Sequence, residues 1–170
     1  GNADVSYTVS RLTLRNAGVV KVSTNDSLNI AGAVVTGDSD DHNDGIRLHG
    51  GTLAVPAAFA FSNYFIAVDM VGSVFHPTTS LMVGDRADLS LSRPHSVTCD
   101  VTVASGAVAR HEVNTTAEVN KLDLTITGNL TVQSNAEVNV SRRGYAGNYG
   151  PGAPLPNGTI RYRCGGSHGG

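Results

Sequence analysis

One short pattern, an apolar residue, any residue and a second apolar residue, recurs along the chain from Leu12 to Val140. Gly, Asn, Asp or Ser separates the copies, and neighbouring copies often lie about eight residues apart. The clearest doublets are Leu12/Leu14, Val20/Val22, Leu28/Ile30, Ile46/Leu48, Leu53/Val55, Phe59/Phe61, Ile66/Val68, Leu81/Val83, Leu89/Leu91, Leu122/Leu124, Leu130/Val132 and Val138/Val140. Alternation with a period of two buries one face of an extended strand. The pattern predicts many short strands joined by tight corners.

Some doublets belong to a longer unit, in which two doublets flank a five-residue corner. Three copies of this unit align, at residues 20–30, 81–91 and 130–140. One constant offset relates the first copy to the third, and the same offset relates Gly18 to Gly128 upstream. Internal repetition of short strands is typical of solenoids, in which each repeat stacks on its neighbours.

The corners favour a parallel β-helix over an antiparallel β-sandwich, which stays open as the alternative. A sandwich needs hairpins, and Asn-Gly or Asp-Gly hairpin signals are sparse, with Asp44-Gly45 as one candidate. Most corners carry an isolated Gly or Asn, residues that tolerate a positive φ where a coil turns between faces. With three short strands and their corners taking about 20 to 25 residues, we expect about six coils.

Composition and charge support an all-β chain and exclude several partners. The chain is rich in Val, Ser and Thr and poor in Lys and Glu, which disfavours long helices. A net charge of -2 provides no broad positive field, so we expect no nucleic acid partner. No stretch approaches the roughly 20 apolar residues that span a bilayer, so we expect no membrane insertion.

The composition changes after residue 143. We predict a β-solenoid domain over residues 1–143 and a Gly/Pro/Tyr-rich loop or linker over residues 144–170, which cannot continue the coil pattern. The chain reads as a fragment of a longer protein or as a processed chain. Cys99 and Cys164 are candidates for a disulfide, although Cys99 also fits a buried thiol in the alternation around Val97 to Val103.

The C-terminal third resembles a known class of proteins. Its residues are Leu-Asp-Leu-Thr-Ile-Thr-Gly-Asn-Leu-Thr-Val-Gln-Ser-Asn-Ala-Glu-Val-Asn-Val at 122–140, Gly-Tyr-Ala-Gly-Asn-Tyr-Gly-Pro-Gly at 144–152, and a Gly-Gly-Ser-His-Gly-Gly end. They resemble segments of very large, repetitive secreted or surface proteins, mostly bacterial, built on right-handed parallel β-helices. The resemblance implies a secreted or cell-surface location and a structural, adhesive or glycan-contacting role. It brings no catalytic residues.

An acidic loop between two predicted strands is a candidate calcium site. Oxygen ligands cluster in it as Ca²⁺ requires, at Asp38, Asp40, Asp41, Asn43 and Asp44. The loop is not an EF-hand, because position 42 is His and the twelfth position, Gly51, lacks the bidentate Glu. The competing interpretation is a solvated acidic loop, which leaves calcium as the one candidate cofactor.

The same segment supports an enzyme hypothesis. Parallel β-helices include polysaccharide lyases and hydrolases, which use paired carboxylates, a basic residue and a histidine on an exposed sheet face. Residues 38–49 supply such a set in Asp40, Asp41, Asp44, Arg47 and His49. The Asp-Asp and His-Gly elements here are too close together for the polygalacturonase pattern, and no nucleophile or nucleotide motif occurs elsewhere.

The residues after the last doublet are a candidate glycan contact. Aromatic rings can stack on sugars and arginines can pair with acidic glycans, which points to Arg142, Arg143, Tyr145 and Tyr149. The arginines could instead cap the solenoid. The hypothesis we favour is a non-enzymatic structural or adhesive β-helix module of an extracellular or cell-surface protein. Its expected partners are the rest of a longer chain or like modules, with cell-surface glycans as candidate ligands.

Overall fold

The computed structural model describes residues 4–36, 43–146 and 149, which contain strands and no helix. All named pairings between these strands are parallel. The strands are β1 (Ser6–Leu14), β2 (Val19–Ser23), β3 (Ser27–Thr36), β4 (Gly45–His49), β5 (Thr52–Ala54), β6 (Ala58–Phe61), β7 (Phe65–Val68), β8 (Val74–Phe75), β9 (Ser80–Val83), β10 (Asp88–Leu91), β11 (His95–Val97), β12 (Asp100–Val103), β13 (Val108–Arg110), β14 (Leu124–Ile126), β15 (Leu130–Val132) and β16 (Glu137–Val138). Within the described residues, no helix is long and apolar enough to cross a membrane.

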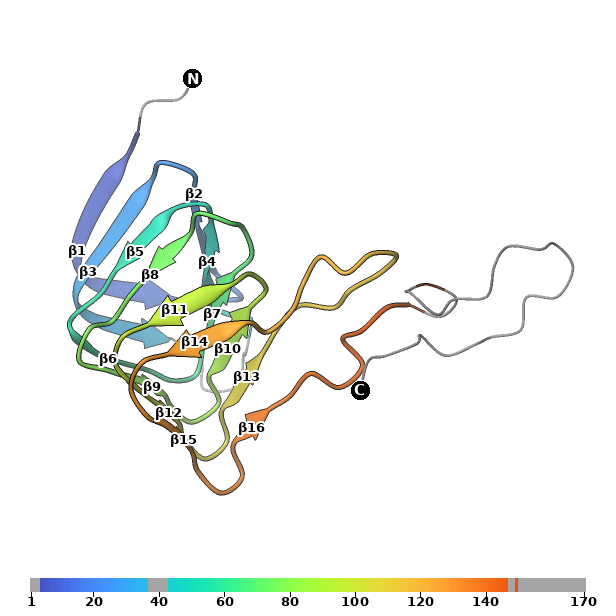
Figure 1. Cartoon of the computed structure of the whole chain (residues 1–170). Helices are drawn as coiled ribbons and strands as arrows, with labels where there is room; N and C mark the ends of the chain where they lie inside the picture. The colour runs from blue at the N-terminus through green and yellow to red at the C-terminus, as the bar shows by residue number, and fades with distance from the viewer. Residues whose placement is uncertain (1–3, 37–42, 147–148, 150–170) are drawn as a thin grey trace, which may run out of the picture.

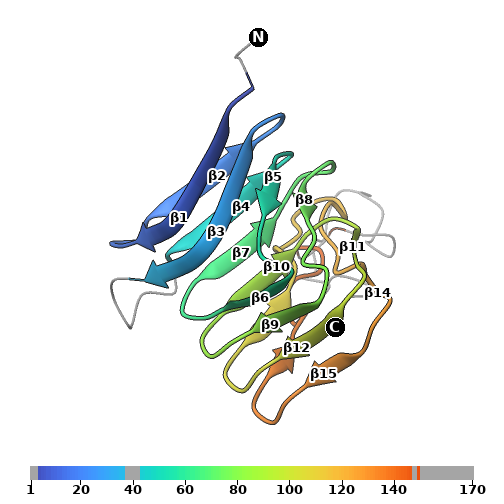
Figure 2. The ribbon, with the colours of Figure 1, turned by 90° about the vertical axis from the view of Figure 1, so that its left-hand side faces the viewer.

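The strands stack into a three-sided parallel β-helix, seen in Figure 2 as successive rungs. Sheet A is β1-β3-β5-β8, sheet B is β2-β4-β7-β10-β13-β16, sheet C is β6-β9-β12-β15, and sheet D is the pair β11-β14. From β4 onward, the chain passes from a sheet B strand to sheet A or D, then to sheet C, and returns to sheet B one rung further on. This topology confirms the β-helix and excludes the antiparallel sandwich.

The stack has about four complete turns, fewer than the six expected. Gly45 pairs with Phe65 and Asp88 with Val108, so each of these turns lies at the lower end of the predicted length range. The turn from Val108 to its partner Glu137 is longer, because residues 111–123 leave the coil before β14. The described residues before β4 also form only the two long strands β1 and β3 and the shorter β2. The residues before β4 and residues 111–123 therefore do not add the two further coils that the sequence predicted.

The corners have one recurring geometry, which confirms the prediction of positive φ at isolated corner residues. The third residue of the turn adopts φ of 69° at Asn25, 54° at Arg86, 81° at Gly106 and 61° at Asn135. The turns close through hydrogen bonds from Asp26 N to Ser23 O (2.9 Å), Ala87 N to Gly84 O (3.0 Å), Ala107 N to Ala104 O (3.0 Å) and Ala136 N to Gln133 O (3.1 Å). A β-turn with positive φ at its third residue favours Gly or Asn there.

The three aligned copies of the repeat do not lie on equivalent faces. Residues 81–91 and 130–140 both turn from sheet C into sheet B, whereas residues 20–30 turn from sheet B into sheet A. The true register pairs Leu81 with Val101 and Val101 with Leu130. The repeat therefore encodes a corner with its two flanking strands and does not mark one full turn.

The interior is a continuous apolar column formed by the inward residues of the doublets. Ile46, Ile66 and Leu89 of sheet B are fully buried and stacked in register. Rings from sheets A and C add a buried aromatic group, in which Phe59 contacts Phe75 edge to face with centroids 6.0 Å apart. These aromatic rings therefore belong to the core.

Sheets A and D belong to one side of the solenoid, which is interrupted between β8 and β11. The backbone ladder does not continue there, and His95 Nε2 instead lies 2.7 Å from Phe75 O. The His95 ring also stacks on His76, with centroids 5.1 Å apart. A side-chain hydrogen bond takes the place of a backbone one.

A lateral arm, formed by residues 111–123 and 141–146, projects from the side of the solenoid (Figure 1). Asn114 N donates to Arg143 O at 3.1 Å and Ala146 N to Thr115 O at 2.8 Å, which joins its two segments. Tyr145 Oη donates to Glu118 at 3.3 Å. The first residues after the predicted boundary at 143 thus contact the loop that leaves β13.

Candidate functional site

The outward face of sheet B carries the largest set of interacting charged side chains that we find in the described residues. Because inward residues such as Ile46 and Leu48 alternate with outward ones, Arg47 and His49 of β4 both face away from the core. One outward column runs in register across five rungs as Lys21, Arg47, Ala67, Ser90 and Arg110. The next outward position along four of these rungs carries His49, Asp69, Ser92 and Glu112. We call this surface the sheet B face.

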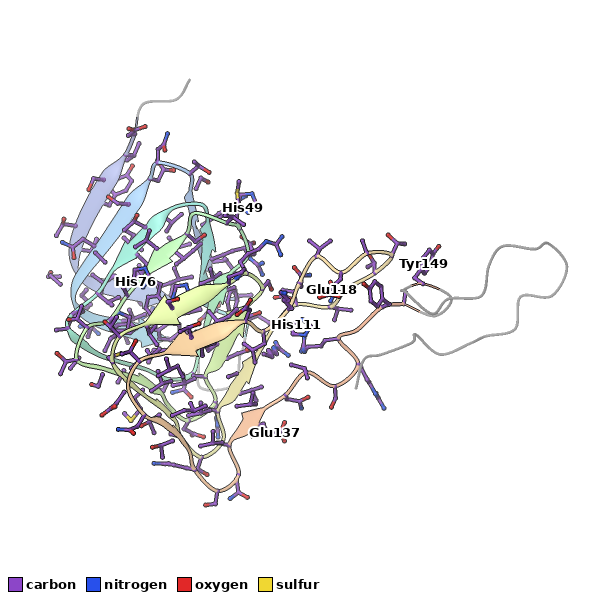
Figure 3. The ribbon with its side chains drawn as sticks, in the orientation of Figure 1. His49, His76, His111, Glu118, Glu137 and Tyr149 are labelled. Atoms are coloured by element: carbon purple, nitrogen blue, oxygen red, sulfur yellow. The ribbon has the colours of Figure 1, made fainter. Side chains whose placement is uncertain are left out.

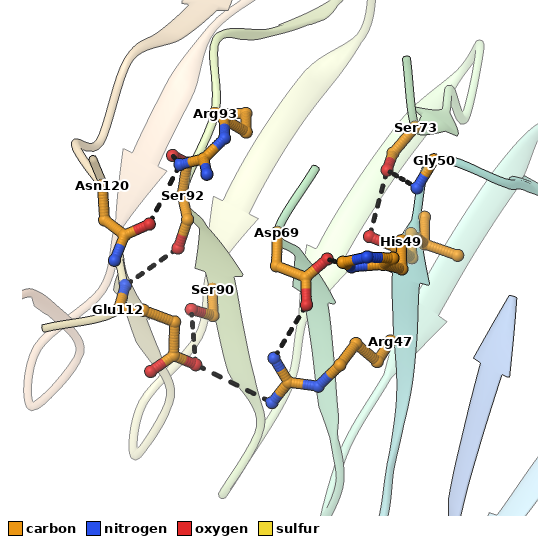
Figure 4. A network of polar contacts seen from close by, with 11 residues as sticks. Arg47, His49, Gly50, Asp69, Ser73, Ser90, Ser92, Arg93, Glu112 and Asn120 are labelled. Carbon is orange, nitrogen blue, oxygen red and sulfur yellow. Dashed lines mark hydrogen bonds and ion pairs between the residues drawn. The ribbon is translucent and has the colours of Figure 1, made fainter. Parts of the chain in front are cut away.

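Arg47 is the centre of the network drawn in Figure 4. Its Nη1 lies 3.1 Å from Asp69 Oδ2, and its Nη2 lies 4.0 Å from Glu112 Oε1. The guanidinium is also 5.7 Å from the centroid of the Phe65 ring, within cation–π range. Two carboxylates from different rungs are therefore held on one arginine, whose own position is fixed by a ring beneath it.

Asp69 also orients His49. Its Oδ1 lies 2.9 Å from His49 Nδ1, while its other oxygen contacts Arg47. An ionised carboxylate only accepts hydrogen bonds, so Nδ1 carries the proton and Nε2 is the free nitrogen of the neutral ring. The His49 side chain remains 44% exposed.

A second charged group lies beside the first, on β10, β13 and the lateral arm. Asp88 and Arg110 form an ion pair across adjacent rungs. Burial raises the pKa of the Asp88 carboxyl above its ordinary value, and Arg110 only partly opposes the rise. Burial also lowers the pKa of Arg143, and the positive charge of Arg110 lowers it further. Asp88 Oδ1 and Arg110 Nε have no hydrogen-bond partner within the described part of the chain.

Hydrogen bonds fix the base of the lateral arm against β10. Ser92 Oγ accepts a 3.0 Å bond from the backbone of Glu112, and Ser90 Oγ lies 3.4 Å from the Glu112 carboxylate. Arg93 donates to Asn120 Oδ1 at 2.9 Å and to the carbonyl of Val119. Glu112 is thereby presented to Arg47 from a fixed backbone position.

The predicted acidic site is only partly within the described residues. Asp38, Asp40 and Asp41 lie outside them, so the calcium hypothesis remains a prediction for those positions. Asp44 is fully buried, and its Oδ1 accepts a 2.7 Å bond from Gly18 N, which ties the start of β4 to the turn before β2. Asp44 Oδ2 has no hydrogen-bond partner among the described atoms. Across the described ranges, no three His, Cys, Asp or Glu side chains are grouped to hold a metal ion.

The predicted catalytic set separates into two environments. Arg47 and His49 meet on the sheet B face, whereas Asp44 is buried beneath the surface. The carboxylates that join Arg47 and His49 are Asp69 and Glu112, from other turns of the helix. From segment 38–49, Arg47 and His49 therefore belong to the network, and the carboxylates that bind them come from other turns.

The predicted glycan contacts are also distributed. Arg143 lies near Arg110 and Asp88 at the edge of the sheet B face. Tyr145 contacts Glu118 of the lateral arm, and Tyr149 is exposed on the same side of the molecule (Figure 3). Arg142 is exposed, in a turn where its φ is 58°. Of the four, Arg143 is the one placed with the charged network.

Sequence reasoning missed Asp69, Asp88, Arg110 and Glu112. Asp69, Asp88 and Arg110 each lie next to an inward apolar residue, and Glu112 lies two positions beyond β13. The doublets give the side on which these residues point. Their neighbours across rungs depend on the length of each turn, which varies along the rod and which the doublets do not specify.

The candidate disulfide lies half outside the described residues. Cys99 is buried in the core before β12, and burial raises the pKa of its thiol. Cys164 is not described, so the pairing remains a prediction.

Comparisons with protein-family models, curated proteins and solved structures find no match. On the sheet B face, cations and carboxylates from four consecutive rungs, β4, β7, β10 and β13, contact one another.

Proposed function

We propose that this protein is a non-enzymatic structural and adhesive β-solenoid module of a secreted or cell-surface protein, and that it contacts glycans through the sheet B face. The observation that supports this proposal is the connected network of Arg47, His49, Asp69 and Glu112 on an exposed face. Large repetitive proteins of bacterial surfaces supply the expected context, in which like modules lie before and after this one.

The chemistry of the face suits a sugar polymer. Arginine forks donate paired hydrogen bonds to carboxylate or neighbouring hydroxyl oxygens, and carboxylates accept hydrogen bonds from neighbouring sugar hydroxyls. Rungs repeat about every 4.8 Å along the axis, so a polymer lying along the axis contacts side chains from successive rungs. Lys21, Arg47, Arg110 and Arg143 outnumber the carboxylates Asp69, Asp88 and Glu112 around them. This balance favours an acidic polysaccharide.

Binding to a panel of acidic and neutral polysaccharides tests the proposal. The double variant Arg47→Ala/Arg110→Ala should weaken binding at least tenfold, because it removes two charged donors from the centre of the face. Arg11→Ala is the matched control, since Arg11 is exposed on β1, away from the face, and should leave binding unchanged. Equal affinities for the double variant and the wild type would place the contact elsewhere. Absence of binding to every polymer would remove the glycan role.

The second candidate is a polysaccharide lyase or hydrolase, favoured by one observation. His49 is held by Asp69 with Nε2 free, and Glu112 lies on the same arginine, so a base and a second carboxylate share one exposed surface. Release of reducing ends or unsaturated sugars from the panel, with calcium or with chelator, measures this activity. Release by the wild type that Asp69→Asn abolishes would establish the enzyme and overturn the non-enzymatic proposal.

A further inference from the structure

The C-terminal end of the described solenoid exposes its interior. The last strands β14, β15 and β16 each pair with one neighbour only, among the residues described. Side chains that would be core in the middle of the rod are exposed here, including Leu130, Val132, Val138 and Val140. Leu130 and Val138, together with Leu124 and Ile126, line an apolar cavity of about 230 Å³. Open strand edges next to apolar surface favour association with another chain.

The opposite end presents the same two kinds of group. Among the described strands, β1 pairs only with β3, and β2 only with β4. Val19 of β2 is 48% exposed, which equals the exposure of Val138 on β16 at the other end of sheet B.

The charges of the strands at the two ends are opposite. The first strands, β1 and β2, carry Arg11 and Lys21 and no acidic residue, and Arg15 lies in the turn between them. The last strands, β14 to β16, carry Glu137 and no Lys or Arg. All four side chains are exposed, and none forms an ion pair within the described residues. Opposite charges favour contact between unlike ends, whereas two like ends repel.

We propose that copies of this chain associate head to tail, with the N-terminal coil of one copy stacked on the C-terminal coil of the next. Head-to-tail stacking lets strands of the second copy run parallel to those they meet, the pairing found in every ladder of the fold. Such a contact joins two different surfaces, so it does not close on itself in a straight rod and extends into filaments. This inference goes beyond glycan contact and is independent of it.

Sedimentation velocity of the full chain tests the proposal with one blocked end at a time. Val138→Lys blocks the C-terminal end by placing a cation where the positive end docks, and Val19→Asp blocks the N-terminal end in the converse way. The wild type should grow beyond a dimer as concentration rises, and less so in high salt. Each variant alone should stay monomeric. An equimolar mixture should form a dimer that does not grow, since one open end of each kind remains.

Two further variants make the result specific. Met82→Lys changes a side chain of similar exposure (44%) in the middle of the rod, and it should assemble like the wild type. Glu137→Lys alters an exposed residue of the last coil, so it tests the same end without entering the cavity, and it should raise the concentration needed for assembly. A monomeric wild type at every concentration would overturn the proposal. So would dimers of Val19→Asp alone, which would indicate pairing of like ends.

Discussion

Tyr64 places a phenolic hydroxyl in the core without a hydrogen-bond partner among the described residues. Burial raises the pKa of this hydroxyl above its ordinary value, so it stays protonated across the working range of pH. An unpaired buried hydroxyl destabilises the fold by about 1 to 3 kcal/mol. Its ring nevertheless packs on Phe61, with centroids 5.2 Å apart.

Tyr64→Phe should therefore stabilise the protein. The change keeps the ring and removes the unpaired oxygen, so we expect the free energy of unfolding to rise by about 1 kcal/mol. Urea denaturation at neutral pH measures the difference. Tyr7→Phe is the control, because Tyr7 is exposed and should show no change. A loss of stability in Tyr64→Phe would show that the hydroxyl has a partner.

His95 should make stability depend on pH. Burial lowers the pKa of its ring below the ordinary 6.5, although the hydrogen bond to Phe75 O partly opposes the shift. As pH falls below about 6.5, the unfolded chain therefore takes up a proton before the folded one. Stability is full above this pH and falls as pH decreases toward the lower folded pKa. Denaturation curves at pH 7.5 and 5.5 should show a smaller change for His95→Gln than for the wild type.

Single side chains also set the limit of prediction from the sequence. The enzyme hypothesis placed Arg47 and His49 on one exposed sheet face, and both lie on the outer face of β4 because they are two residues apart. Asp69 and Glu112, which complete the network, come from other turns of the helix. Their contact depends on how many residues each intervening turn contains, and local patterns do not determine that number.

The corner is the element that repeats most faithfully in this fold. Asn25, Arg86, Gly106 and Asn135 occupy the same left-handed position, and a glycine there has no Cβ to strain. The sequence predicted such corners at Gly and Asn, which tolerate a positive φ, but it did not predict the one at Arg86. It did not predict which faces each corner joins, since the same apolar doublets flank a B-to-A and a C-to-B corner.

Gly106→Ala should reduce the free energy of unfolding by about 1 kcal/mol or slightly more, because a Cβ is disfavoured at φ of 81°. A Cβ there would also clash with Asp85 Oδ1, but that exposed side chain can rotate away. Gly72→Ala is the matched control, since its φ is 89° and no atom lies within 4 Å of the added carbon. Urea denaturation should give similar losses for the two variants. A much larger loss at Gly106 would mean that Asp85 cannot move.

At the scale of the whole molecule, the position of a coil in the rod decides what its core residues contribute. Leu81 and Leu130 occupy the same register column of sheet C, through Val101 between them. Leu81 is buried by coils on both sides, whereas Leu130 is exposed on the last coil. In a solenoid each coil is stabilised mainly by its neighbours.

Leu81→Ala should reduce the free energy of unfolding by about 2 to 5 kcal/mol, because it opens a cavity in a closed core. Leu130→Ala should reduce it by less than about 1 kcal/mol in dilute protein, where the end coil has no neighbour. Equilibrium urea denaturation of both variants provides the comparison. Equal losses would contradict the open end.

The overall architecture was the part most accessible from sequence. Doublets from Leu12 to Val140 and corner residues such as Asn135 predicted a stacked parallel β-helix, as found. The number of turns was overestimated, because nothing in the doublets marks residues 111–123 as a detour that leaves the coil. An insertion of this kind destabilises the fold only slightly, since the entropic cost of closing a loop grows slowly with its length.

The arrangement of the ladders has a mechanical consequence. In a solenoid the hydrogen bonds between rungs run along the long axis, so tension applied from end to end pulls on them one rung after another. The end coil would detach first, while the coils beneath it remain folded. A central turn, such as the one from Gly45 to Phe65, would then lengthen the molecule by about 60 to 70 Å as it straightens. Under tension, such a rod would extend in steps, and the unfolding of each coil would dissipate part of the applied work.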